Sequence, residues 1–96
     1  MGQQIVPGVT VSSSGEATVD PSLKDTLFDL AINLEGPTNL PVDIEHVLAA
    51  IVLAARQNEI DSNTPICADD EALISVLAPN IKSVFKHYGG NVGSDD

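Results

Sequence analysis

The chain of 96 residues carries 14 acidic and four basic residues, which give it a formal net charge of −10. This length accommodates one small domain, and two Phe and one Tyr leave most of its core to aliphatic side chains. The charge argues against binding to nucleic acids or anionic membranes, because both kinds of binding depend on basic residues that neutralise phosphates. A basic protein partner is compatible with it.

The sequence also indicates the cellular compartment in which the protein is expected. The single cysteine, Cys67, permits no intrachain disulfide, which suits a reducing environment. The first residues show neither the basic region nor the long apolar region of a signal peptide. The longest apolar run, residues 47–55, is far shorter than the ~20 residues that cross a bilayer. We therefore expect a cytoplasmic protein.

Residues 1–19 lack helical periodicity and are punctuated by Gly, Pro and Ser. Two short alternating stretches, residues 9–11 and 17–19, flank residues 12–16 and could pair as a hairpin, although an isolated hairpin is only marginally stable in water. The pattern leaves two alternatives open for this segment, a flexible tail or an ordered extended segment.

A first helix is predicted over residues 20–35. Asp20 can cap it, Pro21 occupies the first helical position, and a stripe of leucines follows at helical spacing, with Phe28 and Ile32 beside it. Gly36 and Pro37 are expected to end this helix.

A second helix is predicted over residues 43–58, with Asp43 as its N-cap. Its middle is apolar on nearly every side, and a helix of this kind is normally buried all round. With only a few short helices to cover it, part of its apolar surface could remain open.

A loop over residues 59–67 leads to a third helix over residues 69–78, and a last helix follows over residues 80–88. The break between them is placed at Pro79, because proline inside a helix removes one hydrogen bond and clashes with the preceding turn. Residues 91–96 are expected to be a disordered acidic tail. The predicted architecture is thus all-α, a small bundle of three to four helices in one domain over residues 20–90.

Two clusters invite a metal-binding interpretation, and both have a simpler explanation. Asp43 and His46 are three residues apart on a helix, but a metal site needs three or four ligands, and Asp43 is a good helix cap. The acidic residues of the loop at 61–71 do not match a calcium loop, since the required glycine and final carboxylate fall on Ile66 and Ala72. No metal site is predicted.

Residues 45–51, Glu-His-Val-Leu-Ala-Ala-Ile, resemble the helix opening of the N-terminal repeat of Clp ATPases, where a Glu-His-Leu-Leu stretch follows a helix rich in Leu and Ala. The similarity extends at most over residues 23–86. It departs from that family in the inserted residues 61–68 and in the single repeat. The resemblance implies one helical repeat that docks substrates or adaptors without catalysis.

No phosphate-binding loop, catalytic-triad spacing or basic and aromatic surface is found, so neither enzymatic activity nor a cofactor is expected. The surplus apolar surface of the second helix instead predicts a protein–protein interaction module, an adaptor or docking domain that could be homodimeric. Its proposed interface consists of Val47, Leu48, Ala50, Ile51, Ala54 and Ala55. Complete coverage of that helix by its neighbours is the competing interpretation.

Two other functions remain open. The charge of −10 would suit an acidic inhibitor or immunity-type protein that binds a basic partner by electrostatic steering. Residues 20–23, Asp-Pro-Ser-Leu, resemble the Asp-Ser-Leu of acyl carrier proteins, which implies a small carrier modified on Ser22, although Pro21 interrupts that motif. Cys67 beside Ile66 is typical of a small buried residue rather than of a nucleophile.

Overall fold

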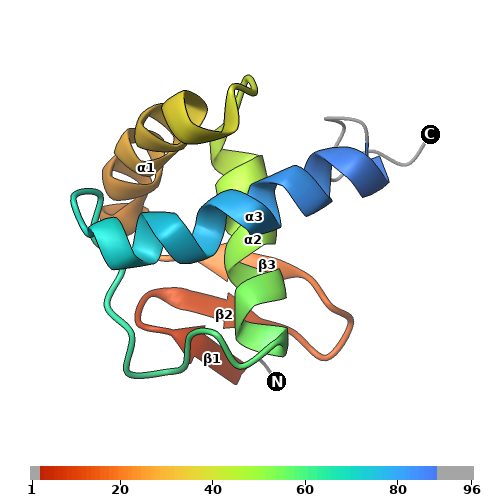
Figure 1. Ribbon diagram of the computed structural model, residues 1–96. Helices are drawn as coiled ribbons and strands as arrows, with labels where there is room; N and C mark the ends of the chain where they lie inside the picture. Colours follow the sequence, from red (N-terminus) through yellow and green to blue (C-terminus); the bar gives the residue numbers. More distant parts are fainter. Residues whose placement is uncertain (1–2, 89–96) are drawn as a thin grey trace.

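Three strands precede three helices in the computed structural model, which describes residues 3–88 (Figure 1). The chain order is β1 (Gln3–Val6), β2 (Val9–Val11), β3 (Ala17–Val19), a 3₁₀ turn η1 (Pro21–Leu23), α1 (Lys24–Thr38), α2 (Ile44–Arg56) and α3 (Glu71–Tyr88). The strands form one antiparallel sheet in the order β1-β2-β3. The all-α prediction is therefore wrong, and the fold combines a small sheet with three helices. Of the two alternatives for the N-terminal segment, a flexible tail or an ordered extended segment, residues 3–19 adopt the ordered one. The predicted tail at 91–96 lies outside the described residues.

The turn between β1 and β2 follows from Pro7-Gly8. Val6 pairs with Val9 across this two-residue connection, and Gly8 has a φ of +90°, a conformation that glycine adopts without strain. A Cβ atom at Gly8 would also lie 2.9 Å from Cδ2 of Leu23. The backbone turn therefore requires glycine here, and a side chain would in addition displace the end of Leu23.

The sheet persists because one of its faces is part of the core. Val6 and Val9 are fully buried, and Ile5 and Val19 pack against the same cluster. A bulge between Gln4 and Val6 allows the neighbouring residues Ile5 and Val6 both to contact the core. Two strands alone would be marginal, but a third strand and the helices behind the sheet supply the missing apolar contacts.

Two substitutions in β1 test whether one face of the sheet packs against the helices. We expect Val6→Ala to lower the free energy of unfolding by about 2 kcal/mol, because it removes two methyl groups from a fully buried site. Gln4→Ala, at an exposed position of the same strand, is the control and is expected to change it by less than about 0.5 kcal/mol. Urea unfolding measures both. Equal effects would contradict the packing of β1 against the helices.

α1 follows directly on η1, which has a side-chain cap, and a left-handed residue ends α1. The predicted cap at Asp20 is confirmed, since its carboxylate accepts hydrogen bonds from the backbone N–H and the hydroxyl of Ser22. These bonds, the backbone one first, lower the pKa of Asp20. The predicted end at Gly36 and Pro37 is wrong, because the helix continues to Thr38. It ends where Asn39 adopts a left-handed conformation and donates its N–H to the carbonyl of Glu35, 2.8 Å away.

Both ends of α2 are capped by hydrogen bonds. Asp43 accepts from the first-turn backbone N–H groups, while its own N–H donates to Nδ1 of His46 at 2.9 Å, so the predicted cap is confirmed as a capping box in which histidine replaces the usual glutamate. At the other end Asn58 is left-handed, and its N–H and that of Glu59 bond to the carbonyls of Ala55 and Ala54. This pair of hydrogen bonds is a Schellman motif.

α3 runs without interruption from Glu71 to Tyr88, so the prediction of two helices separated at Pro79 is wrong. Asp70 caps it by accepting from the backbone N–H groups of Ala72 and Leu73. Pro79 lies on the exposed side, as does Ser75, whose carbonyl loses its helical donor to the proline. Solvent can hydrate that carbonyl, so the helix tolerates the residue.

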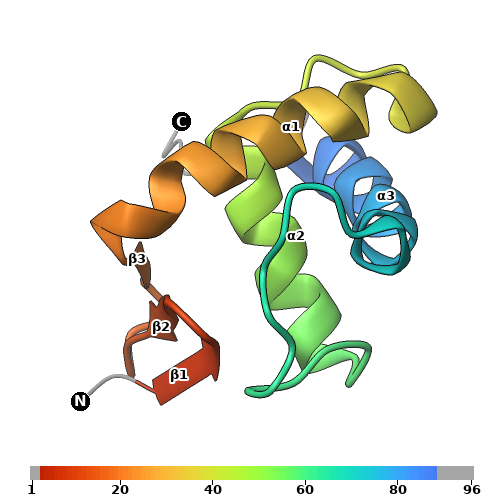
Figure 2. The same cartoon turned by 90° about the vertical axis from the view of Figure 1, so that its left-hand side faces the viewer.

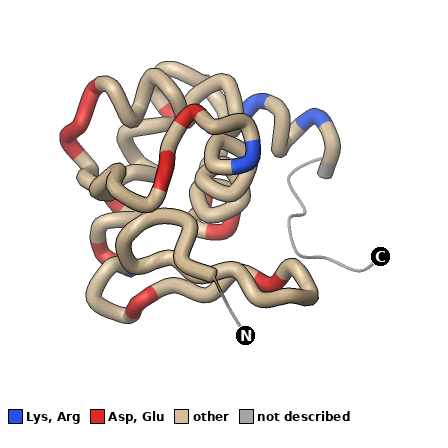
Figure 3. Tube along the Cα trace, turned by 90° about the horizontal axis from the view of Figure 1, so that it is seen from below, with Lys and Arg blue, Asp and Glu red and all other residues tan. Residues whose placement is uncertain are grey.

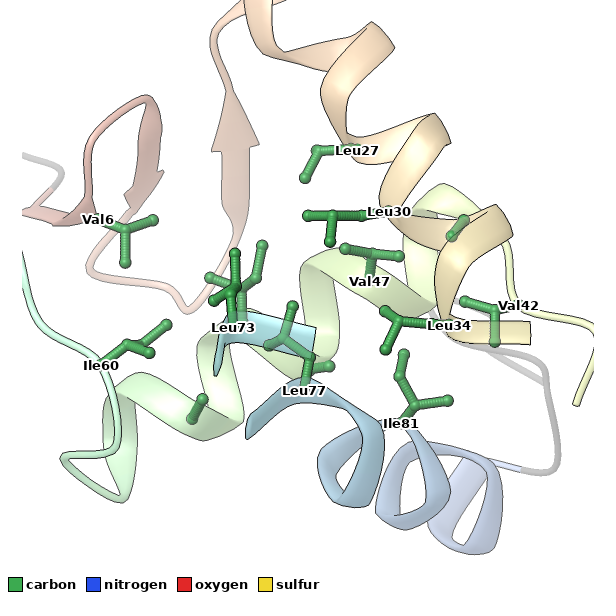
Figure 4. Packing of buried hydrophobic residues seen from close by; sticks show 14 of the residues in the cluster. Val6, Leu27, Leu30, Leu34, Val42, Val47, Ile60, Leu73, Leu77 and Ile81 are labelled. Carbon is green, nitrogen blue, oxygen red and sulfur yellow. The ribbon is translucent and has the colours of Figure 1, made fainter. Parts of the chain in front are cut away.

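α2 forms the centre of the molecule. α1 and α3 pack against it and against each other, and the sheet lies beside its C-terminal half (Figure 2). The segment between α2 and α3 runs back along α2, and Asn33 of α1 anchors it by donating to the carbonyl of Ala68 at 2.7 Å. Side chains from every layer meet in one cluster, in which Val6 of the sheet and Ile60 of the connecting segment face Leu73 and Leu77 (Figure 4).

Candidate functional site

The structure places the proposed interface of α2 mostly in the core. Val47, Ala50, Ile51 and Ala54 are fully buried. Leu48 and Ala55 are partly buried and pack against the same cluster. The four fully buried residues are covered by the rest of the chain, whereas Leu48 and Ala55 keep part of their surface exposed, so most of the proposed interface is not open to a partner.

His46 and Asp43, the most suggestive pair in the sequence, serve the structure of α2. Both are used in the capping box, and the buried ring of His46 also packs on Phe85 of α3 with ring centroids 4.4 Å apart. Within residues 3–88 no three His, Cys, Asp or Glu side chains are grouped so that they could hold a metal ion. The pair links the start of α2 to α3.

The remaining sequence candidates are separate from one another. Asp61 organises its own turn by accepting from the N–H of Asn63 and the hydroxyl of Thr64. Ser22 donates its hydroxyl to Asp20. Cys67 is exposed rather than buried, so the prediction from its neighbour Ile66 is wrong. Among the described residues, no hydrogen bond joins any two of the side chains of Asp61, Ser22 and Cys67.

An exposed apolar pair lies on the outer side of α1. Phe28 and Ile32 are one helical turn apart and expose 54% and 52% of their surfaces, while every other large apolar side chain of the described residues is less exposed. The opposite side of α1 is buried through the stripe of Leu27, Leu30, Ala31 and Leu34. Residues four apart are neighbours on a helix, so the two exposed side chains form one continuous surface.

Acidic residues surround this pair, which we call the α1 patch (Phe28 and Ile32). Asp25 and Asp29 lie on one side of it and Glu35 on the other, as helical periodicity dictates, and all three are exposed. Lys24 is the one basic residue of α1. The patch therefore combines apolar contact area with a negative potential. Such a surface complements a segment that is apolar and basic.

A second surface feature is a groove between the sheet and the C-terminal half of α2. It encloses about 380 Å³ and is lined by Ile5, Val11, Val52, Ala55, Gln3, Ser12, Ser13 and Arg56. The first four of these residues are apolar and partly buried, and the other four supply one cation and three neutral polar groups. The groove is open to solvent and suits a small amphipathic ligand.

Charge is distributed unevenly between these two places. Acidic positions are spread over most of the surface in Figure 3, whereas the few basic positions gather mainly at one side. No Asp or Glu lines the groove, although the chain has 14 of them. Within residues 3–88 the guanidinium of Arg56 forms no ion pair or hydrogen bond. The lining of the groove thus holds one cation and no acidic side chain.

Comparisons with known proteins supply no relative for this chain. No protein-family model, no curated protein and no solved structure matches it. The resemblance of residues 23–86 to a Clp ATPase repeat consequently stays a prediction from sequence. Within the described part of the chain, no helix is both long and apolar enough to cross a membrane.

Proposed function

We propose that this protein is a non-catalytic interaction module that docks a basic partner protein on the α1 patch. The observation that carries the proposal is the exposure of Phe28 and Ile32, at 54% and 52%, one turn apart on a helix whose other side is buried. Burial of large apolar side chains drives association, and aromatic residues are enriched among those that dominate interface energies.

Charge argues for a different protein as the partner rather than a second copy of this chain. A twofold symmetric dimer on the α1 patch would bring the same surface of both copies together. Asp25, Asp29 and Glu35 of one copy would then approach those of the other, with one Lys24 on each side to offset them. Like charges at an interface oppose association, whereas a basic partner would be attracted.

The size of the patch indicates a short docking segment. Two half-exposed side chains offer on the order of 200 Å² of apolar surface. A standard interface buries roughly 800 Å² on each partner, so polar and charged contacts must supply the remainder. An amphipathic helix with basic residues beside its apolar stripe meets both requirements. An acidic inhibitor of a basic protein would use the same surface.

A photo-crosslinking amino acid at position 28, introduced in the cells that produce the protein, tests the proposal. We expect it to capture one main partner, because Phe28 would lie within the interface. The same crosslinker at position 82, an exposed residue of α3, is the control and should not capture that partner. A crosslink to a second copy of the chain would contradict the proposal and support a homodimer.

The captured partner then permits a quantitative measurement. Phe28→Ser combined with Ile32→Ser should weaken its binding at least tenfold in calorimetry, because both apolar contacts are lost. The two positions are about half exposed, so the melting temperature should fall much less than for the same substitutions at buried positions. Unchanged affinity for the double variant would exclude the α1 patch as the docking surface.

A further inference from the structure

We propose that the groove between the sheet and α2 binds a medium-chain aliphatic carboxylate, with the alkyl chain on its apolar floor and the carboxylate on Arg56. This site is independent of the α1 patch and does not depend on the function proposed above. Different elements build it: β1 and the end of β2 form one wall, and the last turns of α2 form the other (Figure 2).

The floor of the groove is suited to an alkyl chain. Ile5, Val11, Val52 and Ala55 all line it, and each is only partly covered by the chain itself. The β1 bulge helps to create this floor, because it brings Ile5 to the core side together with Val6. A ligand that covers these side chains removes apolar surface from water on both partners.

The polar groups of the groove favour a carboxylate head group. Arg56 offers a planar set of donors that matches a carboxylate in two parallel hydrogen bonds, and no described residue competes for it. The amide of Gln3 and the hydroxyl of Ser13 are likewise without partners within residues 3–88 and lie on the same rim. Ser12 is held in place, since its Oγ bonds to Oγ of Ser14 and accepts from the N–H of Glu16.

The C-terminal end of α2 and the net charge of the chain both oppose the binding of an anion in the groove, and hydrogen bonds at the end of α2 weaken the first effect. The C-terminal end of a helix carries partial negative charge from its unbonded carbonyls. In α2 the carbonyls of Leu53, Ala54 and Ala55 all accept backbone N–H groups of residues 57–59. The net charge of −10 also repels anions, but its effect over distance is screened by salt, whereas a contact with Arg56 is screened less.

An alkyl carboxylate fits the groove better than a peptide does. A volume of about 380 Å³ lies at the small end of ligand pockets, and an extended peptide needs several backbone hydrogen-bond partners. The floor of the groove is purely aliphatic, and its volume is small for a peptide. We therefore commit to the alkyl chain as the occupant.

Octanoate titrated into the ¹⁵N-labelled full chain, followed by NMR, tests this site. We expect saturable shift changes at the amides of Ile5, Val11, Val52 and Arg56, with a dissociation constant on the order of 1 mM for a ligand of this size in an open groove. Butanoate should bind at least tenfold more weakly, because four buried methylene groups are missing. An absence of saturation, or saturable changes confined to other residues, would overturn the proposal.

Matched variants separate the role of Arg56 from that of net charge. Arg56→Met should weaken octanoate binding about tenfold, whereas Lys82→Met, which makes the same change in net charge on α3, should leave it unchanged. Arg56→Lys should retain part of the affinity. Equal binding by Arg56→Met and the original chain would overturn the assignment of the carboxylate. Tighter binding of a short peptide with an apolar last residue than of octanoate would also overturn the proposal, in favour of a peptide terminus.

Discussion

Replacing Ile51 by alanine is expected to lower the free energy of unfolding by about 3 kcal/mol. Ile51 lies in the middle of α2, is fully buried, and belongs to the cluster that joins all three helices and the sheet. Alanine would remove three carbons and leave a cavity that surrounding helices cannot fully close. For a domain of this size each kcal/mol shifts the melting temperature by roughly 4–8 °C, so the loss is large and easily measured.

Ile32→Ala provides a matched control for this prediction. The substitution is chemically identical and also lies inside a helix, but Ile32 exposes 52% of its surface. We expect it to change the free energy of unfolding by less than about 1 kcal/mol. Thermal and urea unfolding of both variants measure the difference. Equal and small effects would show that the middle of α2 is not enclosed, and would restore α2 as the interface suggested by its sequence.

The starts of the helices were predictable because each depends on a local device. Asp20 caps the 3₁₀ turn that leads into α1, Asp43 caps α2 as expected, and Asp70, which caps α3, lies one residue after the predicted start of that helix. A cap needs only its own side chain and the next few backbone N–H groups, so it is written in a few consecutive residues. The ends were less certain. α1 passes Gly36 and Pro37 because Asn39 supplies the left-handed conformation two residues later.

The sheet and the continuity of α3 were not predictable in the same way. Each strand has three or four residues, and its stability comes from Val6 and Val9 packing on helices far along the chain. Pro79 was expected to break a helix, but it lies on the exposed side, where water can replace the lost hydrogen bond to the carbonyl of Ser75. In both places a tertiary contact or solvent exposure, rather than the local sequence, decided the outcome.

The interface was predicted on α2 because the sheet was not predicted. α2 is apolar on nearly every side, as its sequence indicates, and a bundle of three helices would leave part of it open. α3 and α1 cover most of α2, and the sheet lies beside its C-terminal half, so less of that surplus stays open than in a bundle without the sheet. The sequence indicates the exposed pair on α1 less clearly than it indicates the apolar surface of α2. Phe28 and Ile32 lie beside the leucine stripe of a helix that otherwise looks like an ordinary amphipathic helix. Only the packing of α1 shows that no neighbour within the described chain covers them.

Asn80 holds together the end of α2 and the middle of α3. Its side chain is 3% exposed, and its amide donates to Oε1 of Glu59 at 2.8 Å and to the carbonyl of Val76 at 2.9 Å, while its Oδ1 accepts from Gln57 at 3.3 Å. All buried side-chain polar atoms of the described residues have partners. The amide is therefore needed as both a donor and an acceptor.

Asn80→Asp is expected to destabilise the protein by about 3 kcal/mol at neutral pH, because it places a buried carboxylate against Glu59 and removes both donated hydrogen bonds. Burial and the neighbouring carboxylate should raise the pKa of the introduced carboxyl group in the folded chain above its value in the unfolded chain. The folded state then binds the extra proton more tightly. The deficit relative to the original chain is complete above the folded pKa and should shrink as the pH falls through it.

Two further variants show whether the contact with Glu59 causes this loss. Adding Glu59→Gln to Asn80→Asp should recover at least about half of the stability, since the new amide can donate to the carboxylate at position 80. Glu59→Gln alone, at an exposed residue, should have a small effect. Urea unfolding between pH 4 and 7 distinguishes the outcomes. If the deficit is independent of pH and unchanged by Glu59→Gln, then repulsion between the two carboxylates is not its origin, and loss of the hydrogen bond to the carbonyl of Val76 is the remaining cause.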